Sequence, residues 1–272
     1  MRCFPSLNSP MPLPRIACFH GGGSNSLVFA YQCKRLQQLL AHEYEFVFFD
    51  APFEREAGPG VLPHFKELAP FRTWMKPEFL QDDESEVLEK VIQLMADDTR
   101  RRQKMAGEHV REGQERQVGK WVGAMGFSQG TRVVGGLLRW MQSATHSSHP
   151  DIDIQFGILC MGSAKPMSCN ASSTRSSSNC SSASSSVHEL QDPDTGALEF
   201  DTIRIPTLHL HGLRDAILPR SREQLALYYD AECSRLLEIN YHHAMPWYTH
   251  DLTTFVALFR ETHERGRNVA EA

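Results

Sequence analysis

Five residues in the middle of the chain, Gly126-Phe127-Ser128-Gln129-Gly130, put the tightest limit on how this sequence can fold. An apolar run precedes them at 121–127 and an amphipathic stretch follows at 131–141, so they lie where a strand turns directly into a helix. In such a turn the serine is strained, and a side chain at position 126 or 130 would collide with the neighbouring strand or helix. G-x-S-x-G in this context is typical of a nucleophile elbow, with an ordinary turn and a surface serine as the alternative.

Apolar runs and helical patterns alternate along the rest of the chain, which is typical of a parallel sheet covered by helices. Strands are expected at 15–20, 44–49, 121–127, 154–160, 207–210 and 235–239, and helices at 27–40, 82–105, 131–141, 221–229 and 247–259. The length of 272 residues suits a single domain of this kind. We therefore predict an α/β fold of the α/β-hydrolase type, with a mostly parallel twisted sheet and helices on both faces.

Two segments differ from this alternation in composition. Residues 1–14 contain several prolines and no apolar run, so we expect a flexible leader and no secretory signal. Residues 167–187 contain eleven serines and bury too little apolar surface to offset chain entropy, so we expect disorder there. Strands of similar type flank the serine-rich stretch, which favours an insert over a domain boundary. The prediction is one domain over 15–263 followed by a polar tail at 264–272.

Residues 53–77 are rich in Pro, Gly and aromatic residues and show no clear period, so we expect a loop. The loop follows the carboxyl end of a strand, which places it over the edge where α/β sheets bind ligands. Its aromatic side chains could line an acyl pocket or simply pack, and the sequence leaves both readings open for Phe53, Phe65, Phe71, Trp74 and Phe79.

A serine hydroxyl becomes a good nucleophile when an imidazole takes its proton and a carboxylate orients that imidazole. After an elbow, the acid and then the base are expected at the ends of later strands. Asp215 follows the strand that ends near position 211 and is the predicted acid. The rival acids are Asp50, Asp201 and Asp230, of which Asp50 precedes the elbow and fails the expected order.

Two adjacent histidines follow the strand at 235–239 and compete for the role of base. Neighbouring loop residues point in different directions, so only one of them can face Ser128. We favour His243, which lies three residues before Pro246, and keep His242 as the alternative.

His20-Gly21-Gly22-Gly23 follows the first strand, where an HGGG-type oxyanion turn is expected. The backbone N–H of Gly22 would act together with that of Gln129 to bind a developing oxyanion. The alternatives are a plain tight turn and, more weakly, a phosphate cradle.

Charge and composition exclude several other classes of function. The net charge is -5, and the most basic run, at 100–104, lies among acidic residues, so no nucleic-acid surface is expected. No stretch is apolar for the ~20 residues of a membrane span. The seven scattered cysteines fit a reduced compartment, and we expect a cytoplasmic protein. His209 and His211 alternate on one strand without further ligands, so buried core histidines are favoured over a metal site, and we predict no metal or cofactor.

Taken together, the segments HGGGSNSLVFAYQ, FVFFDAP, GFSQG, IPTLHLHGLRDAILP and HHAMP resemble the fungal FSH-type serine hydrolases. The resemblance runs from about Arg15 to Phe259 and is interrupted at the serine-rich insert. It implies a triad of Ser128, Asp215 and His243 and an oxyanion turn at 21–23. It also implies an ester or thioester substrate, in some members a polyketide chain on the acyl carrier domain of a synthase.

Three other hypotheses remain beside a polyketide-releasing thioesterase. A general carboxylesterase acting on small free esters would share every catalytic residue. A silent hydrolase fold that only binds a ligand would show a broken triad or oxyanion turn. A scaffold working through the serine-rich segment would lose its function when residues 167–187 are deleted, whereas a hydrolase would largely keep it.

Overall fold

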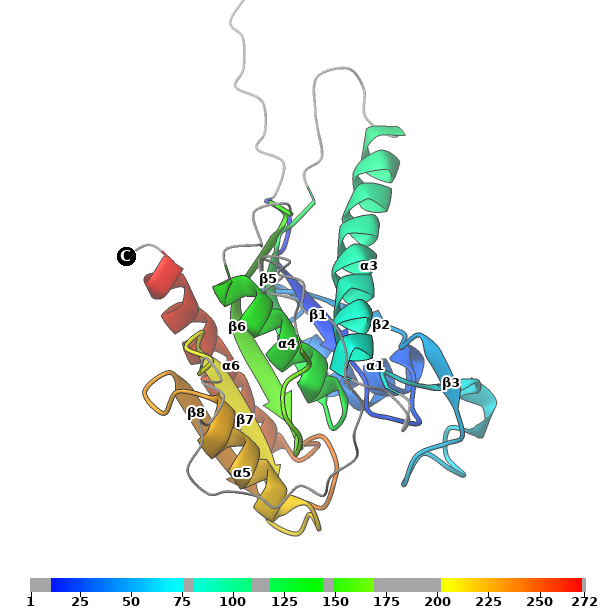
Figure 1. Cartoon of the computed structure of the whole chain (residues 1–272), viewed down its shortest axis with the longest axis vertical. Helices are drawn as coiled ribbons and strands as arrows, with labels where there is room; N and C mark the ends of the chain where they lie inside the picture. The colour runs from blue at the N-terminus through cyan, green and yellow to red at the C-terminus, as the bar shows by residue number, and fades with distance from the viewer. Residues whose placement is uncertain (1–10, 76–80, 109–117, 144–148, 169–201, 271–272) are drawn as a thin grey trace, which may run out of the picture.

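A parallel sheet forms the centre of the computed structural model, which describes residues 11–75, 81–108, 118–143, 149–168 and 202–270 (Figure 1). Its neighbouring strands pair in the order β2-β1-β5-β6-β7-β8, and every pair is parallel. The strands are β1 (Arg15–Phe19), β2 (Glu45–Phe49), β5 (Trp121–Phe127), β6 (Ile152–Cys160), β7 (Thr207–Gly212) and β8 (Ser234–Ile239). The predicted sheet is therefore confirmed.

The strand order reverses between β1 and β5. In chain order, β1 is the first strand of the sheet and β2 pairs on one side of it. The chain then crosses over to β5, which pairs on the other side of β1. At such a reversal the loops leaving the two central strands diverge and open a crevice at the carboxyl edge. The turn at 21–23 follows β1 and Ser128 follows β5, so both predicted parts of the site lie where the strand order reverses.

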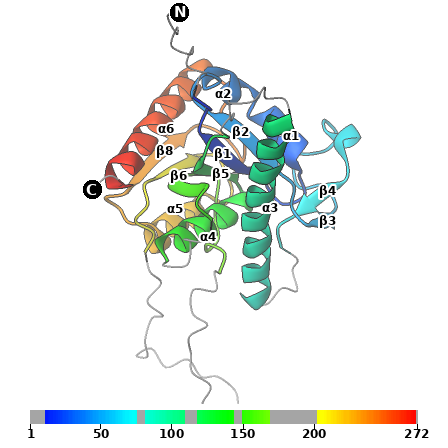
Figure 2. The ribbon, with the colours of Figure 1, turned by 90° about the horizontal axis from the view of Figure 1, so that it is seen from above.

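Helices cover both faces of the sheet, as predicted (Figure 2). Along β1, Ile16 and Cys18 face one core and Ala17 and Phe19 face the other, because successive strand residues point to opposite sides. The first core is closed by α1 (Ser26–Gln32), α2 (Lys34–Leu39) and α6 (Thr249–Ala270). The second is closed by α3 (Gln81–Glu108), α4 (Gly130–Gln142) and α5 (Leu218–Tyr228).

Several predicted boundaries move. The helix expected at 27–40 is two helices that meet at Cys33, and α5 begins at Leu218 instead of position 221. The last helix continues to Ala270, so the predicted boundary at 263 and the start of the polar tail fall inside a helix. The insert at 167–187 lies outside the described residues from position 169 on, and the leader at 1–14 does so up to position 10.

The segment expected to be a plain loop at 53–77 contains two short strands, β3 (Phe53–Arg55) and β4 (Phe71–Thr73), which pair antiparallel. A 3-10 turn at Lys66–Leu68 lies between them. Strands of three residues are too short to show a period, which is why the pattern did not predict them. Phe71 and Trp74 are buried, so these two aromatic residues belong to the packing.

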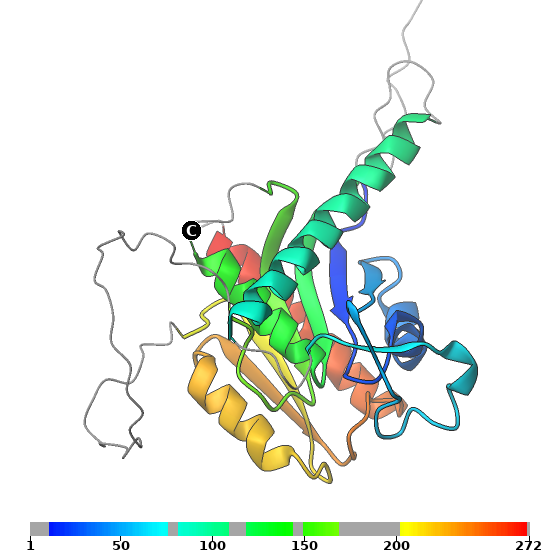
Figure 3. The same ribbon diagram turned by 45° about the vertical axis from the view of Figure 1, so that its right-hand side comes forward.

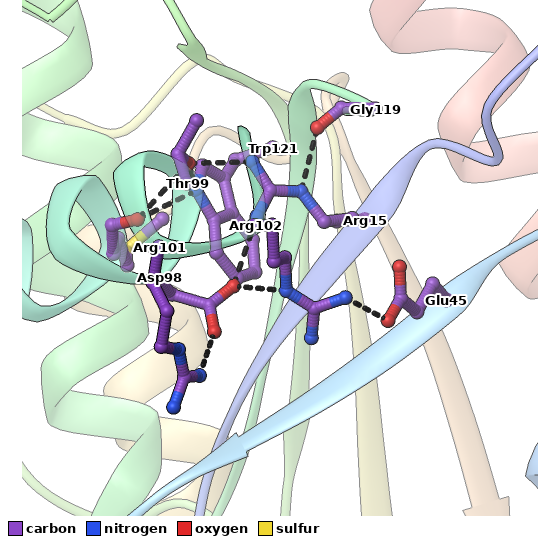
Figure 4. Close-up of polar contacts among 9 residues, drawn as sticks. Arg15, Glu45, Asp98, Thr99, Arg101, Arg102, Gly119 and Trp121 are labelled. Carbon is purple, nitrogen blue, oxygen red and sulfur yellow. Dashed lines mark hydrogen bonds and ion pairs between the residues drawn. The ribbon is translucent and has the colours of Figure 1, made fainter. Parts of the chain in front are cut away.

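A fully buried arginine ties α3 to the amino ends of the central strands (Figure 4). Arg15 donates to Asp98 at 3.0 Å, to Thr99 at 2.6 Å and to the carbonyl of Gly119 at 2.6 Å. Its guanidinium carbon also lies 3.9 Å from the ring centroid of Trp121. These contacts satisfy a charge that would be costly to bury alone.

The carboxylate of Asp98 is shared with two further arginines of the same helix. Arg101 and Arg102 donate to it at 2.5 and 2.6 Å, and Arg102 also pairs with Glu45 of β2. The C-terminal end of α3 extends beyond the sheet (Figure 3), and this cluster adds a polar attachment near that end to the apolar packing of the helix in the second core.

We expect Asp98→Asn to lower the free energy of unfolding by about 3 kcal/mol, because it leaves the buried Arg15 without its counter-charge. The measurement is urea unfolding followed by circular dichroism. Asp97→Asn is the matched control, since Asp97 is exposed and pairs with the exposed Arg100, and its midpoint should stay near that of the wild type. Equal midpoints for the two variants would contradict the role given to the cluster.

Candidate active site

The turn between β5 and α4 has the strained geometry that the sequence predicts. Ser128 lies in the left-handed region with φ of 52°, and its N–H donates to the carbonyl of Cys160 at 2.8 Å. A Cβ on Gly126 would stand 2.4 Å from the carbonyl oxygen of Gly130. A Cβ on Gly130 would stand 2.0 Å from the carbonyl oxygen of Phe19. Both glycines are therefore required by backbone that cannot move aside.

Asp215 and His243 come together at the ends of β7 and β8. The Nδ1 atom of His243 lies 2.6 Å from Oδ2 of Asp215, and the backbone N–H of Ile217 donates to Oδ1 at 3.2 Å. The Asp215 side chain is 4% exposed, whereas that of His243 is 35% exposed. With Nδ1–H donating to the carboxylate, Nε2 of His243 is the nitrogen left to accept a proton.

The two candidate histidines have different surroundings. The ring of His243 packs against that of Phe127, the residue before Ser128, with centroids 5.0 Å apart. His242 is exposed, and its Nδ1 lies 2.9 Å from the carbonyl oxygen of Arg214. Of the two, it is therefore His243 that pairs with Asp215 and lies beside the elbow.

Backbone hydrogen bonds hold the two loops that carry this pair. The N–H of Arg214 donates to Tyr241 at 2.9 Å, and that of Leu213 donates to Ile239 at 2.8 Å. A Cβ on Gly212 would lie 2.6 Å from the carbonyl oxygen of Tyr241, so the loops approach too closely for any other residue. The spacing of the two loops is thus set by main chain, which fixes the distance between the backbones of Asp215 and His243.

The rival acids have other contacts. The N–H of Ser26, at the start of α1, donates to Asp50 at 2.8 Å. Asp230 accepts from the N–H groups of Glu232 and Cys233 at 2.9 and 3.2 Å. Asp201 lies outside the described residues.

The glycine turn at 21–23 lies directly against the elbow. A Cβ on Gly21 would be 3.3 Å from Cβ of Ser128, and one on Gly22 would be 3.2 Å from Oε1 of Gln129. Within the described ranges, the backbone N–H groups of Gly22 and Gln129 have no acceptor. Two unused donors beside a strained serine are what an oxyanion site requires.

Side chains that sequence reasoning missed brace this turn. Oε1 of Gln129 accepts from the Thr73 hydroxyl and from the N–H of Trp74, both at 2.9 Å. Nε1 of Trp74 donates to the carbonyl of His20 at 2.8 Å, and the N–H of Gly23 donates to Arg72 at 2.8 Å. The one sequence signal for these contacts was Trp74, an aromatic residue whose role the sequence left open between lining a pocket and packing in the core.

His209 and His211 are buried on β7 with ring centroids 6.2 Å apart. Burial lowers the pKa of His209 to about 3, and the neighbouring His211 adds to this shift. The described part of the chain contains no group of three or more His, Cys, Asp or Glu side chains that could hold a metal ion. None of the helices in the described ranges offers the apolar run that a bilayer span needs.

Comparison with known proteins gives the family. The model of the family "Serine hydrolase (FSH1)" matches residues 11–255. Esterase citA of Monascus ruber is 31% identical, with the alignment covering 94% of each chain. Esterase claE of Penicillium crustosum is 32% identical over 93% of this chain and 94% of its own. The chain therefore belongs to the FSH1 family of serine hydrolases, and it is an ester-hydrolysing enzyme with the α/β-hydrolase fold.

A solved structure shows the same fold at much lower identity. An uncharacterized protein from Bacillus cereus ATCC 10987 superposes with a TM-score of 0.51 at 12% identity, covering 97% of this chain and 64% of that chain. At this identity the likeness concerns the arrangement of the elements alone.

We expect Gly130→Ala to destabilise the protein by about 3 kcal/mol, because its methyl group would meet the fixed carbonyl of Phe19. Thermal unfolding followed by circular dichroism measures the effect. Gly60→Ala is the control: Gly60 has φ of 76° but open space around it, so only the backbone penalty of about 1 kcal/mol applies. A loss for Gly130→Ala no greater than that for Gly60→Ala would show that the close approach at the elbow is not required.

Proposed function

We propose that this serine hydrolase cleaves an ester or thioester through an acyl-enzyme, with Ser128 as nucleophile, His243 as base and Asp215 as the acid that orients it. The observation that carries the proposal is the 2.6 Å contact between His243 and Asp215 beside the left-handed Ser128. The buried carboxylate keeps the imidazole in the tautomer whose Nε2 can take the serine proton.

The reaction has two steps. In the first, Nε2 of His243 takes the proton of Ser128 as Oγ attacks the carbonyl carbon, and the C–O or C–S bond then breaks. The imidazolium protonates an alcohol leaving group. A thiolate can leave unaided, and the imidazolium then gives its proton to that thiolate or to solvent, so His243 is neutral again before the second step. In the second, water attacks the acyl-enzyme while giving a proton to His243, and Ser128 recovers its hydroxyl proton as the acid product departs.

The negative oxygen that forms in both steps needs donors that are already in place. The N–H groups of Gly22 and Gln129 are proposed for this, because the glycine turn lies directly against Ser128 and the Gln129 side chain, and neither N–H has an acceptor in the described ranges. Loss of one such donor typically costs ~10²–10³ in rate. An intact pair of this kind, together with the Asp215–His243 contact, argues against a silent ligand-binding fold.

For the biological substrate we propose a polyketide acyl chain bound as a thioester to the carrier domain of its synthase. The proposal rests on the resemblance to fungal FSH-type hydrolases. The alternative is that the enzyme is a general carboxylesterase whose substrates are small free esters. The described cysteines are free thiols, which fits a cytoplasmic setting where such synthases would be met.

The histidine pair tests the mechanism. We expect His243→Ala to lower kcat for a p-nitrophenyl acyl ester at least ~10³-fold, as Ser128→Ala should, because either change removes proton transfer from the nucleophile. His242→Ala is the matched control, and its kcat should stay within ~3-fold of the wild type because the His242 ring is exposed and its Nδ1 is paired with the Arg214 carbonyl, away from Asp215. Loss of activity in His242→Ala with survival in His243→Ala would reverse the assignment of the base.

Two substrates test the proposed chemistry of release. The wild type and Ser128→Ala are compared on a p-nitrophenyl ester and on a polyketide-like acyl chain attached to a carrier domain. We expect a higher kcat/KM for the carrier thioester, because the carrier would add binding energy remote from the reacting carbonyl. Turnover of the small ester alone would replace the releasing role by that of a general esterase.

A further inference from the structure

The proposed oxyanion turn at 21–23 consists of residues with high conformational freedom, although the Gly22 N–H has to be held in one orientation. Gly21, Gly22 and Gly23 follow one another, and without a Cβ the peptide unit between two glycines can rotate at little steric cost. A rotation of the unit between Gly21 and Gly22 would turn the Gly22 N–H away from the substrate. Some other group must therefore hold this peptide in one orientation.

The side chain of His20 is in contact with that peptide. It is fully buried at the end of β1, and its Nδ1 lies 2.7 Å from the carbonyl oxygen of Gly21. Its other ring nitrogen, Nε2, lies 3.1 Å from the backbone nitrogen of Ala51, just after β2. Both polar atoms of the ring are thus in use inside the protein.

The tautomer of His20 follows from these two partners. A backbone N–H can only donate, so Nε2 must be the nitrogen without a hydrogen. Nδ1 then carries the hydrogen and donates it to the carbonyl of Gly21. Burial lowers the pKa of His20 to about 4, so the ring keeps this neutral form across the pH range in which an imidazole base works.

The geometry of the peptide unit connects this hydrogen bond to the site. In a planar trans peptide the C=O of one residue and the N–H of the next point in opposite directions. With the Gly21 carbonyl held toward the His20 ring, the Gly22 N–H points away from it. On the basis of the proposed function, we propose that His20 is a positioning residue that aims the Gly22 N–H at the oxyanion.

The ring of His20 is itself firmly held. Trp74 packs against it with centroids 5.2 Å apart, and the indole Nε1 of Trp74 donates to the His20 carbonyl. Trp74 is in turn held by the carboxamide of Gln129, the residue that supplies the second proposed donor. The two donors are therefore linked through a short chain of side-chain contacts.

Two variants separate the two nitrogens of the ring. His20→Asn can place an amide N–H where Nδ1–H stands, whereas the longer side chain of His20→Gln brings its polar group to the position of Nε2. We expect His20→Gln to lower kcat for a p-nitrophenyl ester by ~10- to 10²-fold with KM changed less than ~3-fold. We expect His20→Asn to keep kcat within ~3-fold of the wild type. A trifluoromethyl ketone forms an adduct that carries an oxyanion. Its affinity for the His20 variants should fall in proportion to their kcat/KM.

A purely structural role for the ring predicts a different result. His209→Asn is the control, because His209 is also fully buried but lies on β7, so it should lower the melting temperature without lowering kcat. Equal kcat for His20→Asn and His20→Gln would overturn the inference. So would a fall in kcat that follows the fall in melting temperature across these two variants and His209→Asn. Failure of the proposed function is seen separately, as an inactive wild type or a fully active Ser128→Ala.

A measurement on the wild type remains decisive if the His20 variants do not fold. Nitrogen-15 NMR of the histidine side chains should show His20 as the Nδ1–H tautomer, unchanged between pH 5.5 and 8, because its pKa is near 4. A hydrogen found on Nε2 would exclude the bond to Gly21 and overturn the inference.

Discussion

The close approach of α4 to the end of β1 constrains the backbone of the turn that carries Ser128. Gly130 lies so close to the carbonyl of Phe19 that the helix begins directly against the neighbouring strand. Just before this contact the chain at Ser128 makes its left-handed turn, and the carbonyl of Cys160 of β6 accepts a hydrogen bond from the N–H of Ser128. Because β1 and β6 flank β5 on either side, the strain is held by three strands together.

The halves of the site are assembled in different ways. The proposed acid and base, Asp215 and His243, lie on two loops joined by main-chain hydrogen bonds, with Gly212 allowing the close approach. The oxyanion turn is braced mainly by side chains, those of His20, Trp74 and Gln129. Side-chain bracing is open to substitution in a way that main-chain pairing is not, so the proposed oxyanion donors can be adjusted while the Asp215–His243 pair stays in place.

The features that the sequence could predict are those encoded within a few neighbouring residues. The elbow depends on two glycines flanking Ser128, and the positions of Asp215 and His243 follow from short strands directly before them. The contacts of His20 with Ala51, and of Gln129 with Thr73, join residues far apart in the chain, so no local pattern announces them. The same holds for β3 and β4, which form through pairing across the intervening segment and leave no period of their own.

The buried Arg15 cluster lies at the amino ends of the strands, whereas the elbow and its partners lie at the carboxyl ends. The polar contacts between Arg15 and α3 are therefore spatially separate from the surfaces that would meet a substrate. Changes in the carboxyl-edge loops leave those charges and their partners untouched. Substitutions in the loops at the carboxyl edge can therefore change which substrates are recognised without removing the polar contacts that attach α3 at the other edge.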